Sequence, residues 1–328
     1  MSRRAFALIP IAALVVAVLV VPLPYYSEGP GPAREVEPRI HVSGATLYQS
    51  QGKFVLTSVS FLPLTLTGLV DAWLDPAQTV LPESALVFPG ETQQHADQRA
   101  VSEMDQSKID ATYVVFSRLE GYPERHGPGV LVESIPEEPP GETCPADGEL
   151  FPGDLIQRVN GHEIGSEADF ERVIKAIPDA EPVTFRVSAG GQTTNVTLTR
   201  RPCGGSKRPL IGISTVPNFP DDVSISSGDI GGPSAGTMWA LGMYDLLTPG
   251  DLTGGRTIAG TGTISADGTV GPIGGVQNKI VAAKRAGADV FLVPRGQNYD
   301  DAKKVAGDLP LVPISSFQDA LDYLRHSG

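Results

Sequence analysis

Residues 267–294 read DGTVGPIGGVQNKIVAAKRAGADVFLVP and decide the fold class of this chain. A glycine-rich turn leads into residues 276–286, where apolar residues recur at helical spacing, and a continuous apolar run follows at 290–294. The alternation continues with a predicted strand at 312–314 and a predicted helix at 317–325. Helices and strands that alternate in this way predict an α/β domain, with helices packed on a sheet.

Upstream of this stretch, residues 231–236 read GGPSAG and lead into a predicted helix at 234–247. A serine hydroxyl becomes a good nucleophile only when a base removes its proton and nearby donors stabilise the oxyanion. The backbone N–H groups of Gly232 and Ala235, at a helix start, are candidate oxyanion donors for Ser234. Taken alone, Gly-Pro-Ser before a helix is more often a helix cap than a nucleophile.

The base that would activate Ser234 is expected to be a lysine. The chain has five histidines, none in a context that suggests a triad, and it contains no HExxH. Lys279 lies among apolar neighbours in the first turn of a predicted helix, where burial would keep its amine neutral. The alternative is a surface lysine that extends to water, and Lys284 fits that description better. No metal or cofactor is predicted.

The N-terminus predicts a membrane anchor. Arg3 and Arg4 precede residues 5–23, an uncharged apolar run that as a helix would span about 28 Å. The arginines favour a cytoplasmic segment at residues 1–4, which places the rest of the chain beyond the outer face of the membrane. A cleavable signal peptide is the alternative. Residues 24–39 are rich in proline and glycine and are predicted to be a linker.

Charge and cysteine content limit the partners. The net charge is −13 and no block of lysine and arginine occurs, so nucleic acid is not an expected partner. Cys144 and Cys203 would lie in a compartment that permits disulfides, and they are either a pair or two free thiols.

Residues 125–203 form a self-contained block after the pattern-breaking GYPERHGPG at 121–129. The block is predicted to contain strands and a single helix, at 130–135, 155–159, 167–177 (the helix), 183–189 and 193–199.

Residues 226–294 resemble the proteolytic domain of the Lon peptidase family. The matching pieces are GGPSAG, the Thr261-Gly262 step, residues 267–288 and the strand VFLVP. The resemblance implies that Ser234 is the nucleophile and Lys279 its partner, and that Thr261 orients the lysine. Gly231 departs from the family pattern, since many Lon sequences have an acidic residue there.

A second likeness extends the domain towards the N-terminus. Residues 104–111, MDQSKIDA, resemble the helix that precedes the nucleophile segment in Lon domains. The peptidase domain would then comprise residues 40–122 and 205–328, with the block at 125–203 inserted between them.

The inserted block resembles a PDZ domain of the bacterial protease type. The likeness lies in GVLVESI (129–135), LFPGDLIQRVNGHEI (150–164) and DFERVIKAI (169–177). A PDZ domain binds a peptide as an added strand, so the resemblance implies protein or peptide substrates as partners. Residues 127–131 are one candidate for the loop that binds a peptide carboxylate. A Cys144–Cys203 disulfide is predicted to close the entrance and exit of the block.

Together these features resemble the PDZ-containing Lon-like serine peptidases of Gram-positive bacteria. The resemblance implies an α/β (α+β) Lon-type domain with an inserted β-rich PDZ domain, and a homo-oligomer in keeping with Lon rings. Because no GxxxxGK[ST] occurs, the expected activity is an ATP-independent endopeptidase that cleaves exported or membrane-associated proteins. The alternative is a non-catalytic, membrane-tethered PDZ adaptor on a peptidase-like fold.

Overall fold

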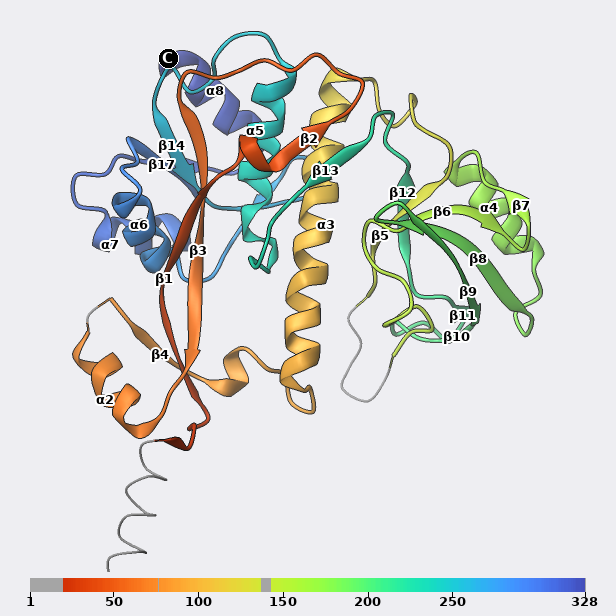
Figure 1. Ribbon diagram of the computed structural model, residues 1–328, viewed down its shortest axis with the longest axis horizontal. Helices are drawn as coiled ribbons and strands as arrows, with labels where there is room; N and C mark the ends of the chain where they lie inside the picture. The colour runs from red at the N-terminus through yellow and green to blue at the C-terminus, as the bar shows by residue number, and fades with distance from the viewer. Residues whose placement is uncertain (1–19, 76, 137–142, 328) are drawn as a thin grey trace, which may run out of the picture.

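The computed structural model describes residues 20–75, 77–136 and 143–327. Within them, the larger sheet runs in the order β18-β17-β14-β3-β1-β4 (Figure 1). Strands β18, β17, β14 and β3 are parallel, whereas β1 is antiparallel to both of its neighbours. The strand bounds are β1 Tyr25–Glu35, β3 Lys53–Pro63, β4 Thr79–Pro82, β14 Thr257–Gly260, β17 Val290–Pro294 and β18 Leu311–Ile314.

Helices cover both faces of this sheet, because successive apolar side chains of a strand point to opposite faces and both faces must be buried. Phe54 and Leu56 of β3 pack into the core beneath α3, α5 and α8, while Val55 packs with α6 and α7 on the other face. The helix bounds are α2 Leu66–Leu74, α3 Gln93–Leu119, α5 Gly236–Leu247, α6 Val276–Arg285, α7 Gln297–Ala306 and α8 Phe317–Ser327. The mixed α/β architecture that the sequence predicts is therefore present.

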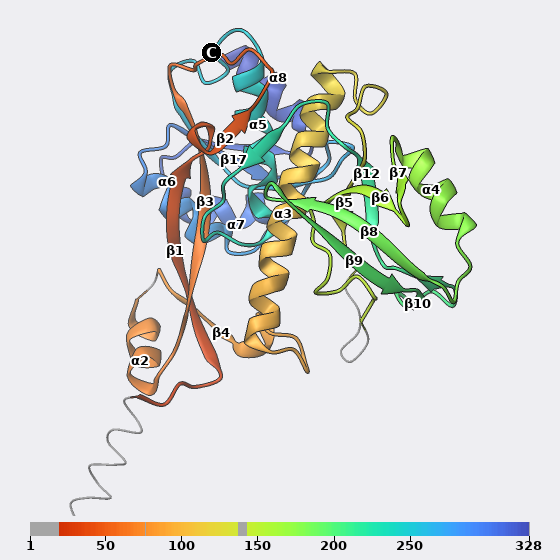
Figure 2. The ribbon, with the colours of Figure 1, turned by 45° about the vertical axis from the view of Figure 1, so that its right-hand side comes forward.

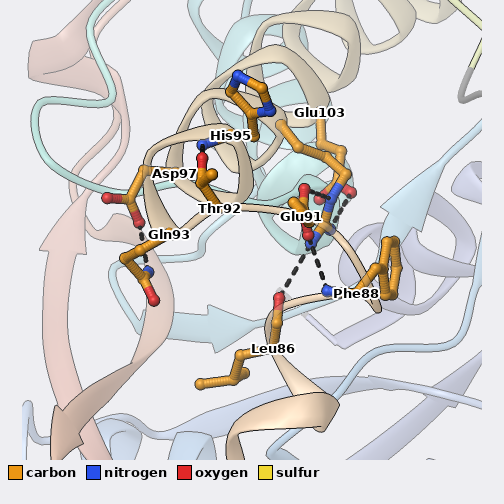
Figure 3. Close-up of polar contacts among 9 residues, drawn as sticks. Leu86, Phe88, Glu91, Thr92, Gln93, His95, Asp97 and Glu103 are labelled. Atoms are coloured by element: carbon orange, nitrogen blue, oxygen red, sulfur yellow. Dashed lines mark hydrogen bonds and ion pairs between the residues drawn. The ribbon is translucent and has the colours of Figure 1, made fainter. Parts of the chain in front are cut away.

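The first turns of helix α3 are polar and have no apolar stripe, so the apolar pattern alone does not show where the helix begins. Thr92 caps its start by accepting a hydrogen bond from the backbone N–H of His95, 3.2 Å away (Figure 3). Arg99 donates to Glu91 and to the carbonyl of Leu86 at 3.1 and 3.0 Å. These contacts fix the end of α3 that reaches the nucleophile loop described below.

The inserted block forms a separate sheet, β12-β5-β6-β8-β9, with β7 paired to β6. We call residues 130–217 the PDZ-like domain; Figures 1 and 2 place α3 between it and the larger sheet. Its elements are β5 Val130–Ser134, β6 Leu155–Val159, β7 His162–Glu163, α4 Glu167–Ala176, β8 Pro182–Ala189, β9 Gln192–Thr199, β10 Arg201–Pro202, β11 Pro209–Leu210 and β12 Ser214–Pro217.

The boundary predicted for this block at residue 203 is wrong. The predicted catalytic segment at 205–328 includes the residues of β12, but β12 pairs antiparallel with β5 and completes the smaller sheet. An apolar, β-branched run shows that a strand exists but not which sheet receives it. Cys144 and Cys203 form a disulfide inside this domain, with Cα atoms 5.2 Å apart.

The linker predicted at residues 24–39 is also wrong, since β1 occupies most of it. The composition of residues 30–32 predicts a linker because they contain two prolines, which cannot donate to a β-ladder. Strand β4 pairs only with Tyr25–Glu28 of β1, so the prolines lie beyond its reach. A register shift between Pro30 and Ala33 lets the pairing with β3 resume.

No helix in the described part of the chain is both long and apolar enough to cross a bilayer. Residues 5–19 of the membrane helix predicted at 5–23 lie outside the described residues. Short elements complete the fold: β2 Ile40–Val42, β13 Val223–Ile225, β15 Thr263–Ile264, β16 Val270–Gly271, and the 3₁₀ helices η1 Glu37–Arg39, η2 Glu83–Ala85 and η3 Pro233–Ala235.

Candidate active site

The loop that presents Ser234 is fixed to α3. The backbone N–H of Gly232 donates to the carbonyl of Ala100 at 2.7 Å, and the Ser107 hydroxyl donates to the carbonyl of Pro233 at 2.9 Å. Gly236 lets the loop approach this closely, since a Cβ there would lie 2.6 Å from Ser107 Oγ. The sequence 231–236 thus places a partly buried Ser234 on η3, at the start of α5.

Lys279 extends from the first turn of α6 into the protein and is only 2% exposed. Its Nζ lies 2.6 Å from Ser234 Oγ, 3.1 Å from Thr261 Oγ1 and 3.2 Å from the carbonyl oxygen of Thr57. The structure therefore brings together Ser234, Lys279 and Thr261, which the sequence predicts as a group.

The hydrogen-bond pattern determines where the protons of a neutral Lys279 lie. The carbonyl of Thr57 can only accept, so one N–H of Lys279 points to it. The Thr261 hydroxyl donates its proton to the carbonyl of Ser234 at 3.0 Å, so its oxygen accepts the second N–H. A neutral amine has two protons and one lone pair, and the lone pair is left facing the Ser234 hydroxyl. This is the arrangement that a general base requires.

Burial makes the neutral amine accessible near neutral pH. It lowers the pKa of Lys279 from 10.5 to about 7, and the negative charge of Glu28 opposes that shift by raising the pKa. Glu28 lies on β1 and is itself 8% exposed. Asn278 donates to the backbone carbonyl and the carboxylate of Glu28 at 3.2 and 3.3 Å, which ties β1 to the start of α6.

The prediction that Gly232 is an oxyanion donor is wrong, because its N–H is already bonded to Ala100. The N–H of Gly232 holds the loop against α3 and is not free to bind a substrate oxygen. The carbonyl of Ser234 accepts the N–H of Gly262 at 2.9 Å, which fixes the orientation of the peptide at the nucleophile. The N–H of Ala235, next to the nucleophile at the helix start, stays a prediction as an oxyanion donor.

Two contributors to the site escape sequence reasoning. The carbonyl of Thr57 is a backbone group, and a backbone group has no signature in the side-chain pattern. Glu28 lies in the stretch that composition predicts to be a linker, so nothing marks it as buried. Among the described residues, no group of three or more His, Cys, Asp or Glu side chains could hold a metal ion.

Comparison with known proteins shows what this domain is similar to. Residues 223–325 match the Lon protease (S16) C-terminal proteolytic domain. Lon protease 2 of Bacillus subtilis is 29% identical over 174 residues, which cover 50% of this chain and 31% of that protein. The Lon protease of Campylobacter concisus is 37% identical over 95 residues, which cover 27% of this chain and 11% of that protein.

The matched segment is thus similar to the Lon proteolytic domain, and it contains Ser234, Thr261 and Lys279. The chain covers less than a third of the length of these two relatives. A likeness to the crystal structure of the PDZ domain of the SdrC-like protein from Listeria monocytogenes covers 27% of this chain and 87% of that one, at 25% identity and a TM-score of 0.23.

Replacing Thr261 tests the proton assignment. Thr261→Val should reduce kcat/KM about 10- to 100-fold, because Lys279 would lose an acceptor and Ser234 a donor to its carbonyl. Thr261→Ser keeps the hydroxyl and should retain most of the activity. Initial rates on a fluorogenic peptide measure both variants. If Thr261→Val and the wild type have equal rates, Thr261 does not orient Lys279.

Proposed function

We propose that this protein is an ATP-independent serine endopeptidase that acts on exported or membrane-associated proteins. The observation that carries the proposal is the 2.6 Å contact between Lys279 Nζ and Ser234 Oγ inside a Lon-type domain. The lysine is buried and the serine is only partly buried, so a base and a nucleophile that solvent can reach meet at one point.

Each group has a defined step in the proposed reaction. Ser234 Oγ attacks the carbonyl carbon of the scissile peptide while its proton passes to Lys279. As the carbon–nitrogen bond breaks, Lys279 returns that proton to the leaving amine, and an ester remains on Ser234. Water then attacks the ester with Lys279 as base, which releases the carboxylic acid and restores the hydroxyl. The backbone N–H of Ala235 would stabilise the oxyanion.

The PDZ-like domain offers a place where such a substrate could be held. Strand β12 is the outermost strand of its sheet within the described residues, and α4 packs close to it. A peptide can add as a strand to an edge of this kind. Strand β5, which follows the candidate loop at 127–131, lies inside the sheet, so the loop at 210–213 before β12 replaces it as the candidate for carboxylate binding.

A cavity of about 530 Å³ lies where this edge meets the catalytic domain. Its walls include Val216 of β12, Ser166 beside α4, Tyr113 of α3 and Ala266 of the β15–β16 hairpin. Ser234 and Lys279 form the proposed catalytic dyad. Thr261, just before that hairpin, contacts both of them. A segment bound along β12 would therefore be close to the peptidase domain.

The disulfide should matter for peptide capture rather than for chemistry. A Cβ on Gly212 would lie 2.3 Å from Cys144 Sγ, so the disulfide packs directly against the loop at 210–213. The backbone N–H of Ala146 donates to the carbonyl of Ile211 at 3.0 Å, which holds the same loop. It closes a separation of 59 residues, for which chain entropy predicts a stabilisation of about 4 kcal/mol.

Replacing both Cys144 and Cys203 with serine should increase hydrogen–deuterium exchange across residues 210–217, measured by mass spectrometry. Cleavage of a short peptide that does not reach the PDZ-like domain should remain as in the wild type. Unchanged exchange in that segment would show that the disulfide does not order the loop.

Three points support the finer parts of the proposal. The sequence contains no GxxxxGK[ST], which supports independence from ATP. Arg3 and Arg4 before the uncharged run at 5–23 support a single-pass anchor with an extracytoplasmic domain. The disulfide supports an oxidising compartment.

Incubation of the detergent-solubilised full chain with an unfolded protein such as casein tests the proposed function. We expect peptide products at the same rate with and without ATP, and none from Ser234→Ala. If wild type and Ser234→Ala release no peptides but both bind casein-derived peptides, the protein is an adaptor instead.

A further inference from the structure

Exposed large apolar side chains gather at one end of the molecule. Of the fourteen such side chains in the described residues, nine lie within residues 20–25 and 61–74. Isolated exposed apolar residues are normal on a protein surface, but a contiguous group marks an interaction site. We call this group the α2 surface: Val20, Val21, Tyr25, Phe61, Leu62, Leu66, Val70, Trp73 and Leu74.

The two segments of the α2 surface are joined by backbone hydrogen bonds. Leu23 donates to the carbonyl of Leu64 at 2.7 Å, and Leu64 donates to the carbonyl of Tyr25 at 2.9 Å. Strand pairing continues from there, with Tyr26 opposite Pro63. Figures 1 and 2 both show α2 and these ends of β1 and β3 together, far from the C-terminus and from the PDZ-like domain.

Helix α2 turns its apolar stripe outward. Leu66, Val70, Trp73 and Leu74 follow the i, i+4, i+7, i+8 spacing of one helix face, and all four are exposed. Trp73 is the extreme case, at 81% exposed. The buried residue of this helix is Ala72. A soluble helix normally packs its apolar stripe against the protein core, so this one needs another apolar environment.

We propose that the α2 surface enters the interfacial layer of a lipid bilayer. Tryptophan and tyrosine favour that layer because their rings are apolar at one end and polar at the other. The sequence supports the same environment, since the uncharged run at 5–23 includes Val20 and Val21 and ends two residues before Tyr25. An anchor there would hold α2 at the depth its apolar stripe requires.

The charges around the α2 surface specify the kind of bilayer contact. No lysine or arginine occurs between Lys53 and Arg99, and Asp71 is exposed on α2 itself. Attraction to anionic headgroups therefore cannot drive the contact, which must rest on apolar burial. Insertion should occur in zwitterionic phosphatidylcholine and should not weaken in high salt.

Tryptophan fluorescence tests the proposal, because the chain has two tryptophans and Trp239 is fully buried. The full chain and Trp73→Phe are each reconstituted in phosphatidylcholine vesicles with and without bromine on the upper acyl chain. Their emission difference reports Trp73 alone, and the residual Trp239 emission reports that the variant is folded. We expect brominated lipid to reduce the Trp73 signal at least about two-fold, as a ring at the headgroup–acyl boundary requires.

Three results would overturn the proposal. Quenching of Trp73 by aqueous acrylamide but not by brominated lipid would place it in water. If neither acrylamide nor brominated lipid quenches Trp73, and its emission depends on protein concentration, a second copy of the chain covers the α2 surface. Because the Ser234→Ala variant should give the same lipid quenching, this proposal and the peptidase proposal fail separately. Flotation with the vesicles but without lipid quenching would leave the anchor standing and refute the α2 contact.

Discussion

Ser234→Ala and Lys279→Met should each lower kcat/KM on a fluorogenic peptide by at least about 10³-fold. The first substitution removes the nucleophile, and the second removes the base while keeping a side chain of similar length. Their effects should not add, because a nucleophile without its base and a base without its nucleophile are both inactive. The double variant should therefore be no slower than either single variant.

Lys284→Met is the matched control for Lys279→Met. Lys284 lies on the same helix, but its ammonium is near the surface, where it donates to the carbonyl of Val305 at 3.5 Å. This variant should keep the wild-type rate, and circular dichroism should show that all the variants are folded. Loss of activity in Lys284→Met but not in Lys279→Met would refute the assignment of the base.

Activity should rise with pH through a midpoint near the Lys279 pKa of about 7. Only the neutral amine can accept the Ser234 proton, and about 1% of it is neutral two pH units below the pKa. The value of kcat/KM at pH 5 should therefore be about 100-fold lower than at pH 9. A pH-rate profile on a substrate without ionisable groups measures this. A midpoint near 10.5, the usual lysine value, would show that burial does not tune this residue.

Substitution of Glu28 provides a second test of the Lys279 titration. Its charge raises the pKa of Lys279 against the larger effect of burial, so Glu28→Gln should move the midpoint of the profile to lower pH. The amide retains an acceptor for Asn278, which preserves the contact between β1 and α6. A purely structural role would lower the rate at every pH without moving the midpoint.

The free energy of unfolding should also depend on the protonation of Lys279. Below pH 7 Lys279 is protonated in both states, but between 7 and 10.5 only the unfolded chain binds the proton, so stability rises with pH in that window. The gain should be about 2 kcal/mol between pH 7 and 9. Lys279→Met should lose it. Urea unfolding of wild type and variant at both pH values measures the difference.

The alternation of helices and strands in residues 257–325 follows from the sequence because each element has its own apolar period. Strand β1 could not be predicted in the same way. Its Gly-Pro-Gly-Pro segment has the composition of a linker, and only the presence of β3 beside it makes a strand stable there. The sequence places residues 214–217, which form β12, in the wrong domain, because strand pairing is a property of the whole fold.

The side chains of the candidate site were predictable, whereas their surroundings were not. Ser234, Thr261 and Lys279 belong to motifs that can be read in order along the chain. The use of the Gly232 N–H by Ala100 depends on how α3 packs against the loop, and no local pattern encodes that contact. Glu28 affects Lys279 only because β1 brings it to the start of α6.

The most direct test of the dyad is covalent capture by a peptidyl β-lactone, followed by peptide mapping. Attack by an activated hydroxyl opens the lactone and leaves an ester on the enzyme. The dyad predicts a single adduct on Ser234, formed with a midpoint near pH 7 and absent from Lys279→Met. An adduct on another residue, or equal labelling of Ser234 in Lys279→Met, would contradict it.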